Sequence, residues 1–386
     1  MSNLLDKSSI LITPTAYNVS EILSMKPSDG SGDADFSRNS GATRTTQDLL
    51  IETVTNNIPR IDYSGGVGSW KFEPQSTNQL LSSNNLTSNW SHVDVNAEYG
   101  FLSPDGTNNA SKLTATGTDP YAFAYSQNIT SQDYTGSAYI KGIGSSIGQT
   151  GKIWIIIDNV HFLQRVFTIT GDWQRVSITE QLGVTVSNFL YIRLDLPDSN
   201  PVIGEQVLVW GAQLENLLYP TSYVPTSGAA STRLGDVAIN SGNSSLINSN
   251  EGVLYTEFYT EADSTDKRIC LSDGTSSNRV VLYITATNTL AVFVQNSNGV
   301  QVSFSSSITL GQYNKAAFKY KENDFSLFLN GTQVGTDTIG EVPSGLDRLN
   351  FSNSAGTSLN FYGRVKSTAV YKEALTDAEL TCLTTI

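Results

Sequence analysis

The acidic pattern closest to a catalytic one surrounds the segment 252–259. Glu251 and Glu257 are six positions apart, with Tyr255 between them. Because side chains alternate along a strand, both carboxylates would face the same side. Two carboxylates are enough for glycoside hydrolysis, so a glycan hydrolase is a minor alternative for this protein. We expect Glu257 to be a solvated strand residue and not a catalytic acid.

Histidine and cysteine are too sparse to form a recognisable catalytic or metal-binding motif. His92 and His161 lie 69 positions apart, without the Cys or acidic spacing that is typical of a zinc site. Cys270 and Cys382 are 112 positions apart and have no paired motif around them. We expect structural or surface histidines and two buried, unreactive thiols. No catalytic residue and no metal ligand is therefore assigned.

The acidic segment 29–35 superficially resembles a calcium-binding loop. An EF-hand loop has acids at positions 1, 3 and 5, Gly at position 6 and Glu at position 12. Here Asp29, Asp33 and Asp35 occupy positions 1, 5 and 7. A flexible turn is expected, with a weak Ca²⁺ site as the alternative, and no other cofactor is predicted.

Aromatic side chains are the best candidates for ligand binding. A sugar ring offers an apolar face to Trp or Tyr, while Asn, Asp and Gln can satisfy its hydroxyl groups. Four aromatic residues that stand among Asn, Ser and Asp are the predicted glycan-binding residues: Trp90, Tyr99, Tyr121 and Tyr125. Trp154 and Trp210 lie inside strong strand patterns, and we expect both of them in the core.

The composition indicates a folded protein and excludes several classes of partner. Tyr 17, Phe 15 and Trp 5 supply large core side chains, although only 39% of the 386 residues are hydrophobic. The chain has 23 basic and 36 acidic residues, a net charge of −13, and no basic patch, so no nucleic-acid partner is expected. The sequence contains no run of about 18 apolar residues, so no membrane span is predicted. The first residues lack the basic start and apolar run of a signal peptide.

Strand patterns dominate the chain. Residues 152–158 form a short apolar run typical of a fully buried strand, and residues 189–196 alternate. Further strands are expected at 206–210, 252–259, 279–284, 290–295, 316–320 and 325–329. Asn-Gly pairs at 298–299 and 330–331 predict hairpin turns.

One short helix is expected at the C-terminus. Thr376 and Glu379 have the spacing of a capping box, and Leu375 and Leu380 fall at the staple positions. The predicted fold class is all-β: two antiparallel β-sandwich (jelly-roll) domains in tandem after an extended N-terminal segment, with one short C-terminal helix. Glycine-rich and proline-rich seams at 65–68 and 219–228 place the domains at 1–75, 76–229 and 230–386.

The first 75 residues are the least domain-like part of the chain. They contain short apolar runs around Ile10, Ile12 and Ile22, which are too few to offset the entropy of ordering the segment. We expect these residues, with Arg38, Arg44 and Arg60, to attach the protein to other subunits. The arginines would pair with Asp35, Glu52 or Asp62, or with acids of a neighbouring subunit. A small independent domain with internal ion pairs is the alternative.

Several strings resemble a module of tailed-phage virion proteins over nearly the whole chain. They are 35–44 (DFSRNSGATR), 59–63 (PRIDY), 72–78 (FEPQSTN), 210–215 (WGAQLE) and 219–223 (YPTSY). Proteins of this kind are head-fibre, tail-fibre or minor structural proteins. The central region looks like a carbohydrate-binding-module jelly roll. Residues 252–383 look like a laminin-G or concanavalin-like lectin sandwich, with the hairpin at 318–334 as its marker.

The resemblance implies a non-enzymatic virion protein whose sandwiches adhere to host-surface glycans. Concanavalin-like hydrolases carry a Glu-x-Asp-x-x-Glu strand, and the middle acid is missing between Glu251 and Glu257. Other capsid or tail subunits are the expected protein partners, and a homo-oligomer, with a trimer favoured, is the expected state. The protein would be made in the host cytoplasm and reside in the virion. A purely structural decoration protein without sugar binding is the main alternative.

Overall fold

The computed structural model describes residues 4, 6–125, 133–158, 161–180, 190–197, 201–354, 356 and 358–386. Almost all of their regular structure is β-strand, with one α-helix, α2 (Asp377–Thr384), and one short 3₁₀ turn, η1 (Gly144–Ser146). The predicted all-β class with a short C-terminal helix is confirmed. No helix in these ranges has the length and apolar character needed to cross a bilayer.

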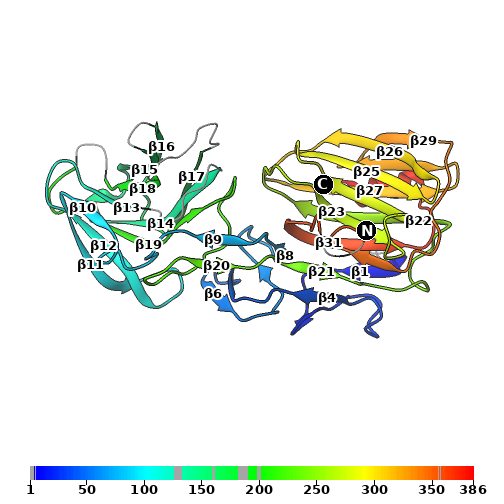
Figure 1. The fold of residues 1–386 in the computed structure, drawn as a ribbon, viewed down its shortest axis with the longest axis horizontal. Coiled ribbons are helices and arrows are strands. Elements are labelled where there is room, and N and C mark those ends of the chain that lie inside the picture. The colour runs from blue at the N-terminus through cyan, green and yellow to red at the C-terminus, as the bar shows by residue number, and fades with distance from the viewer. Residues whose placement is uncertain are drawn as a thin grey trace. The chain divides into compact units, whose positions relative to one another are not determined.

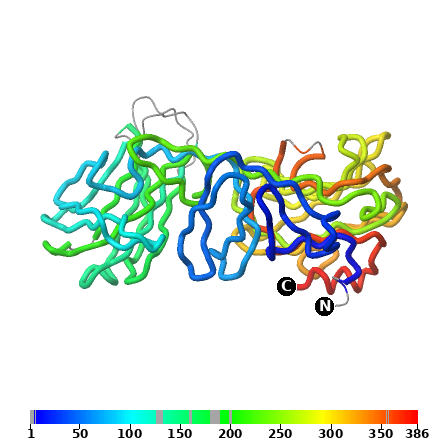
Figure 2. Tube along the Cα trace, turned by 90° about the horizontal axis from the view of Figure 1, so that it is seen from below, coloured from blue at the N-terminus to red at the C-terminus, as the bar shows by residue number. Residues whose placement is uncertain are grey.

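The chain divides into two compact units, and both are discontinuous in sequence (Figure 1). Unit 1 comprises residues 1–41, 54–74 and 234–386, and unit 2 comprises residues 42–53 and 75–233. The N-terminal 75 residues are therefore shared between the two units. Figure 2 shows the first described residues (blue) beside the C-terminal helix (red), where Lys7 forms an ion pair with Glu379.

Unit 1 contains three antiparallel sheets, named here by a central strand. The β22 sheet has the order β29 (Thr332–Asp337), β28 (Phe325–Leu329), β27 (Tyr313–Lys321), β22 (Glu251–Tyr259), β31 (Gly363–Tyr371), β8 (Ser69–Phe72), β7 (Ile61–Asp62), with β1 (Ile10–Ile12) also pairing with β31. The β24 sheet has the order β26 (Gly299–Ser307), β25 (Thr289–Asn296), β24 (Arg279–Ile284), β23 (Lys267–Ser272), β30 (Arg348–Asn350). The β4 sheet has the order β2 (Tyr17–Asn18), β3 (Glu21–Ile22), β4 (Ala34–Ser37), β21 (Val237–Ile239).

The core of unit 1 lies between the β22 and β24 sheets. Alternation along β22 sends Leu254 and Phe258 inward, where they meet Leu282 and Val292 of the facing sheet. The predicted hairpin at Asn330-Gly331 joins β28 to β29, and both turn residues have positive φ (49° and 83°), as such turns require.

The apolar runs of the N-terminal segment belong to this same core. Ile10, Ile12 and Ile22 are fully buried, and β1 pairs with β31 in the register Ile10↔Val370. The expectation that these runs have too few partners to close a core is wrong: β1 pairs with a strand near residue 370, and Ile22 joins the same core cluster. Their side chains are buried within unit 1 and are not available to contact another subunit.

The arginines of the N-terminal segment also differ from the predicted pairing. Arg44 binds Glu52 with an Nε–Oε2 distance of 2.8 Å, as predicted. Arg38 and Arg60 instead share Asp236, at 2.9 Å and 2.5 Å, and all three side chains are fully buried. The carboxyl group of Asp236 thus fixes two parts of the N-terminal segment against the strand region before β21.

The C-terminal helix covers part of the outer face of the β22 sheet. The Thr376 side chain accepts a hydrogen bond from the Glu379 backbone N–H, and the Glu379 carboxylate accepts one from the Thr376 backbone N–H, so the predicted capping box is confirmed. Leu380 and Leu383 pack there with Leu375 and Tyr255.

Unit 2 is a sandwich of two five-stranded antiparallel sheets. The β15 sheet has the order β10 (Ser91–Val93), β13 (Tyr121–Tyr125), β18 (Leu190–Asp195), β15 (Thr150–Ile157), β16 (His161–Thr168). The β19 sheet has the order β11 (Val95–Leu102), β12 (Asn108–Ala115), β19 (Gln206–Glu215), β14 (Tyr134–Ile143), β17 (Gln174–Glu180). Two further pairs complete the described strands: β9 (Ser76–Asn78) with β20 (Ser231–Arg233), and β5 (Ala42–Thr45) with β6 (Ile51–Val54).

Candidate functional site

The outer face of the β15 sheet carries a group of aromatic side chains. Inward positions of β15 and β18 are Ile and Leu, such as Ile153, Ile155 and Ile192, and they fill the core of unit 2. The alternate positions point away from that core. We call them the aromatic face, and its members are Tyr121, Phe123 and Tyr125 of β13, Tyr191 of β18, Trp154 of β15 and Phe162 of β16.

Strand register brings these rings together. Tyr125 lies opposite Tyr191, and their ring centroids are 5.1 Å apart. The Phe123 ring lies 5.5 Å from both Tyr125 and Tyr191 and 6.0 Å from Tyr121. Tyr125 is 44% exposed and Phe162 is 56% exposed, so ring surface is presented to solvent. An exposed group of large aromatics is uncommon on a soluble domain unless it binds something.

Polar groups lie within the same face. Arg193 is on β18 opposite Phe123 and Trp154, and its guanidinium carbon lies 3.5 Å from the Tyr121 ring centroid. Its Nε donates to Asp195 at 2.6 Å, and the indole Nε1 of Trp154 donates to the other carboxylate oxygen at 2.9 Å. Burial disfavours the charged guanidinium, but the hydrogen bond and charge of Asp195 outweigh it and raise the pKa of Arg193. The rings around Arg193 are therefore held in fixed positions.

This arrangement has the chemistry of a sugar-binding surface. Aromatic rings provide flat apolar area, and tyrosine hydroxyls and the guanidinium supply donors at the edge of that area. Burial, and then the neighbouring Tyr125, raise the pKa of Tyr191, so its hydroxyl remains a donor at neutral pH. Binding on such a face requires no reacting group.

Only two of the four predicted glycan-binding residues belong to this face. Tyr121 and Tyr125 do. Trp90 is buried in the core of unit 2, and its Nε1 donates to the Ser82 carbonyl at 2.8 Å. Tyr99 is exposed, but it lies on β11 in the β19 sheet. The structure thus separates Trp90 and Tyr99 from the other two.

Trp154 was expected in the core, and this expectation is wrong. The run 152–158 suggested a strand buried on both faces, whereas Lys152 and Trp154 lie on the outward face and are half-buried. The polar residue at 152 was the available signal, since side chains two positions apart share a face. Trp210 is fully buried, as predicted, and its Nε1 donates to Asn109.

The two carboxylates considered for hydrolysis are not arranged as a catalytic pair. Glu251 and Glu257 both project from the outer face of β22, as expected, but six residues of strand separate them by roughly 20 Å. Glycosidase carboxylates lie about 5–9.5 Å apart. Each is instead near a lysine: Glu251 lies 3.1 Å from Lys321, and Glu257 lies 3.5 Å from Lys366.

Histidines and cysteines lie apart in the fold. His92 is half-buried on β10, and burial lowers its pKa. His161 begins β16, and its side chain lies outside the described residues. Cys270 is buried, which raises the pKa of its thiol to about 12. Cys382 is exposed on α2, so the expectation that both thiols are buried is wrong for this one.

The three carboxylates of the acidic segment 29–35 bind three different partners. Asp29 accepts from Ser31, Asp33 accepts from Ser24, and Asp35 accepts from Asn240. Across the part of the chain that the structure describes, no group of three His, Cys, Asp or Glu residues is placed to hold a metal ion.

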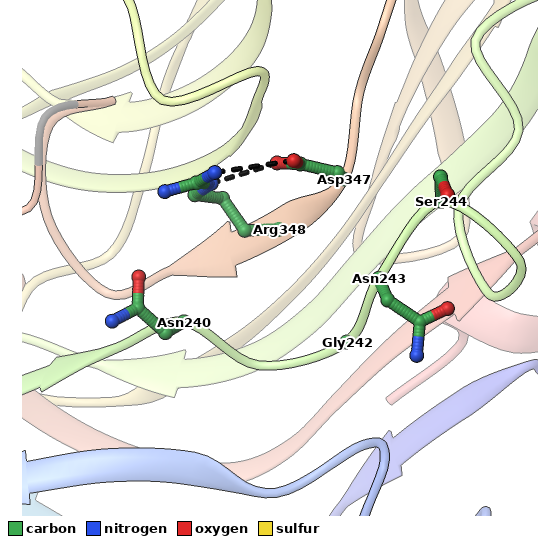
Figure 3. A pocket seen from close by; sticks show the side chains of 6 residues that line it. All are labelled: Asn240, Gly242, Asn243, Ser244, Asp347 and Arg348. Atoms are coloured by element: carbon green, nitrogen blue, oxygen red, sulfur yellow. Dashed lines mark hydrogen bonds and ion pairs between the residues drawn. The ribbon is translucent and has the colours of Figure 1, made fainter.

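Unit 1 also contains a polar pocket of about 360 Å³. Figure 3 shows it between Asp347 and Arg348 at the start of β30 and the segment Asn240–Ser244 after β21. Arg348 donates to both oxygens of Asp347, at 2.7 Å and 3.1 Å, and this pairing raises its pKa. The pocket is lined by amide, hydroxyl and charged groups and lacks an aromatic ring on which a sugar could stack.

One part of the chain is similar to a known protein family. Residues 235–381 match the family described as the concanavalin A-like lectin/glucanases superfamily. The match lies within unit 1, whose β-sandwich is similar to that superfamily, and it agrees with the resemblance noted for 252–383. No curated protein matches the chain.

Several solved structures are similar to parts of the chain. The carbohydrate-binding module CBM40 of a Ruminococcus gnavus IT-sialidase is 17% identical, covers 38% of this chain and 93% of its own, and has a TM-score of 0.33. Domain 4 of AbnA, an arabinanase from Geobacillus stearothermophilus solved with arabinotriose, is 13% identical. The match covers 43% of this chain and 82% of domain 4, with a TM-score of 0.31. A CBM4 structure is 13% identical, covers 40% and 98%, and has a TM-score of 0.27. At these identities and TM-scores the likeness says nothing about this protein's ligand.

Proposed function

We propose that this protein is a glycan-binding protein that acts by adhesion and not by hydrolysis. The observation that carries the proposal is the aromatic face of unit 2, where the exposed rings of Tyr125 and Phe162 share one sheet face with a fixed Arg193–Asp195 pair. The lectin-type match of residues 235–381 supports the same class of ligand for unit 1. Flat rings with hydrogen-bonding groups at their edges fit the mixed apolar and hydroxyl surface of a neutral sugar.

The test uses two tyrosines that match in exposure but not in location. Tyr125 is 44% exposed on the aromatic face, and Tyr99 is 46% exposed on the other sheet of the same unit. The full chain is screened on a glycan array, and the affinities of Tyr125→Ala and Tyr99→Ala for the best ligand are then measured by calorimetry. Loss of one stacking ring at about 0.5–1.5 kcal/mol predicts a roughly 2- to 12-fold weaker affinity for Tyr125→Ala only. Equal affinities of the two variants, or no glycan bound by the full chain, would contradict the proposal.

We further propose that the protein is a component of a phage virion and presents its sandwiches to host-surface glycans. The strings 35–44, 72–78 and 210–215 support this role through their resemblance to virion proteins. Contacts of the N-terminal segment with other subunits would use exposed side chains such as Val19 and Met25, which are 67% and 59% exposed. Labelling of intact particles with an antibody against the protein tests the location, and cross-linking of purified particles tests the expected trimer. Unlabelled particles that lack the polypeptide would contradict the virion role.

A further inference from the structure

The outer face of the β22 sheet in unit 1 holds a guanidinium that has no hydrogen-bond or ion-pair partner among the described residues. Arg364 of β31 lies opposite Tyr259 of β22, and its guanidinium carbon is 4.8 Å from the Tyr259 ring centroid. Within the described ranges it forms no ion pair and no hydrogen bond, whereas Arg348 in the same unit is paired with Asp347. A guanidinium has five N–H donors in a rigid fork that fits an oxyanion.

A second unsatisfied group borders the same place. Tyr313 of β27 lies on the other side of Tyr259, and the two ring centroids are 5.7 Å apart. The Tyr313 hydroxyl is buried and has no hydrogen-bond partner among the described residues. A buried hydroxyl without a partner is unfavourable, and most such groups in native proteins have one.

A glycine turn keeps the space between these groups open. A Cβ atom placed on Gly65 would lie 3.1 Å from Nη1 of Arg364 and 3.8 Å from the Tyr313 hydroxyl oxygen. Both groups therefore face one small space that any other residue at position 65 would fill. The Nζ of Lys366 is 3.7 Å from the Tyr313 ring centroid and adds a second positive charge.

The charges around this space leave Arg364 free to bind an anion. Glu257 is the acid nearest to Lys366, at 3.5 Å. The Tyr259 hydroxyl donates to Glu261 at 2.5 Å, and burial together with this hydrogen bond raises the pKa of Tyr259 to about 12. The carboxylates are thus engaged with Lys366 and Tyr259, and neither forms an ion pair with Arg364.

We propose that Arg364, Tyr313 and the Gly65 turn form a second saccharide site, which binds the carboxylate or sulfate of an acidic sugar. The oxyanion accepts from the Arg364 fork and from the Tyr313 hydroxyl, and the adjoining sugar ring packs against Tyr259. This site lies in unit 1, is separate from the aromatic face and does not depend on it.

Calorimetric titration of the full chain tests the proposal with three defined probes. Oligogalacturonate supplies carboxylates, dextran sulfate fragments supply sulfates, and dextran oligosaccharides of similar length are neutral. We expect binding of at least one acidic probe that exceeds dextran binding by at least about tenfold and weakens as salt rises. Preference between carboxylate and sulfate identifies the group that the site takes.

Two substitutions locate the site, and one substitution is the control. Arg364→Gln removes the fork, and Gly65→Ala fills the space while the arginine is retained. Both should weaken binding of the acidic probe at least about tenfold. Arg348→Gln removes an arginine that is already paired with Asp347, so it should leave the affinity for the acidic probe unchanged. Acidic probes that bind no better than dextran would overturn the proposal, as would unchanged affinity in Gly65→Ala or equal losses in Arg364→Gln and Arg348→Gln. Because Tyr125→Ala should not alter acidic-probe binding, failure here is distinguishable from failure of the aromatic face.

Discussion

Replacing Asp236 by Asn tests whether the N-terminal segment is an integral part of unit 1. Asp236 is fully buried and accepts from Arg38 at 2.9 Å, from Arg60 at 2.5 Å and from the Glu73 backbone N–H at 2.8 Å. Burial disfavours the charged form of Arg60, but Asp236 and then Glu73 outweigh it and raise its pKa. Because arginine is not deprotonated in proteins, Asp236→Asn leaves two buried guanidiniums, with Glu73 still bound to Arg60.

The expected cost follows from this charge imbalance. Removing one partner of a buried ion pair typically costs about 3–5 kcal/mol, because the remaining charge stays buried. For a unit of about 150–250 residues each kcal/mol lowers the melting temperature by about 2–4 °C, so the shift should be roughly 6–20 °C. Asp347→Asn is the matched control, since the Arg348–Asp347 pair of unit 1 is partly exposed and worth at most about 1 kcal/mol.

Differential scanning calorimetry of the full chain measures the effect. The transition of unit 1 is identified as the one that Leu380→Ala lowers, because Leu380 packs under α2 in that unit. Asp236→Asn should lower the same transition and leave the other unchanged. A shift of the unit 1 transition no larger than that of Asp347→Asn would refute the reasoning, and would mean that the N-terminal segment is not anchored by this cluster.

Three further predictions concern the helix α2 and the acids of β22. Thr376→Ala should cost about 0.5–2 kcal/mol from the lost cap and Leu380→Ala about 2–5 kcal/mol from its buried side chain, both measured by urea unfolding, and negligible effects of both would mean a frayed helix. Hydrogen bonds from Lys7 and then Thr376 lower the pKa of Glu379 to about 2, so its contribution to stability is present above its ordinary pKa of 4.5 and is lost as pH falls toward 2. Melting curves of Glu379→Gln between pH 6 and pH 2 should show less of this dependence than the parent, and identical pH profiles would argue against it. Host polysaccharide should release no reducing sugar in a digestion assay, and release that Glu257→Gln abolishes would show that the protein is a hydrolase.

The sequence predicted those parts of the fold that depend on neighbours along the chain. The Asn330-Gly331 turn and the Thr376 capping box depend on residues at most three positions apart, and both were found as expected. The pairing of Arg38 with Asp236 joins residues 198 positions apart, so no local spacing indicates it. The burial of Ile10 is also not indicated by local spacing, because its strand β1 pairs with β31 near residue 370.

The aromatic face was only partly predictable for a different reason. A binding strand can be apolar on both faces, one for the core and one for the ligand, and it then resembles a fully buried strand. In β15 the core face is Ile153, Ile155 and Ile157, and the outer face contributes Trp154. In β13 small alanines alternate with large aromatics, which is typical of a strand with an aromatic outer face, although Tyr121 and Tyr125 were predicted from their polar neighbours in the sequence.

The strings that resemble virion proteins contribute buried residues to the scaffold and do not include the key residues of the two proposed binding sites. Glu215 of the string 210–215 is buried and accepts from Gln213 at 2.8 Å, from Ser76 at 2.7 Å and from the Thr221 backbone N–H at 3.1 Å. Each of these partners belongs to one of the strings, so the strings constrain one another through buried hydrogen bonds whose loss would be costly. Tyr125 and Arg364, on which the two proposed sites depend, lie outside every string. In the two proposed sites, substitutions at these positions therefore leave the buried network that holds the scaffold unchanged.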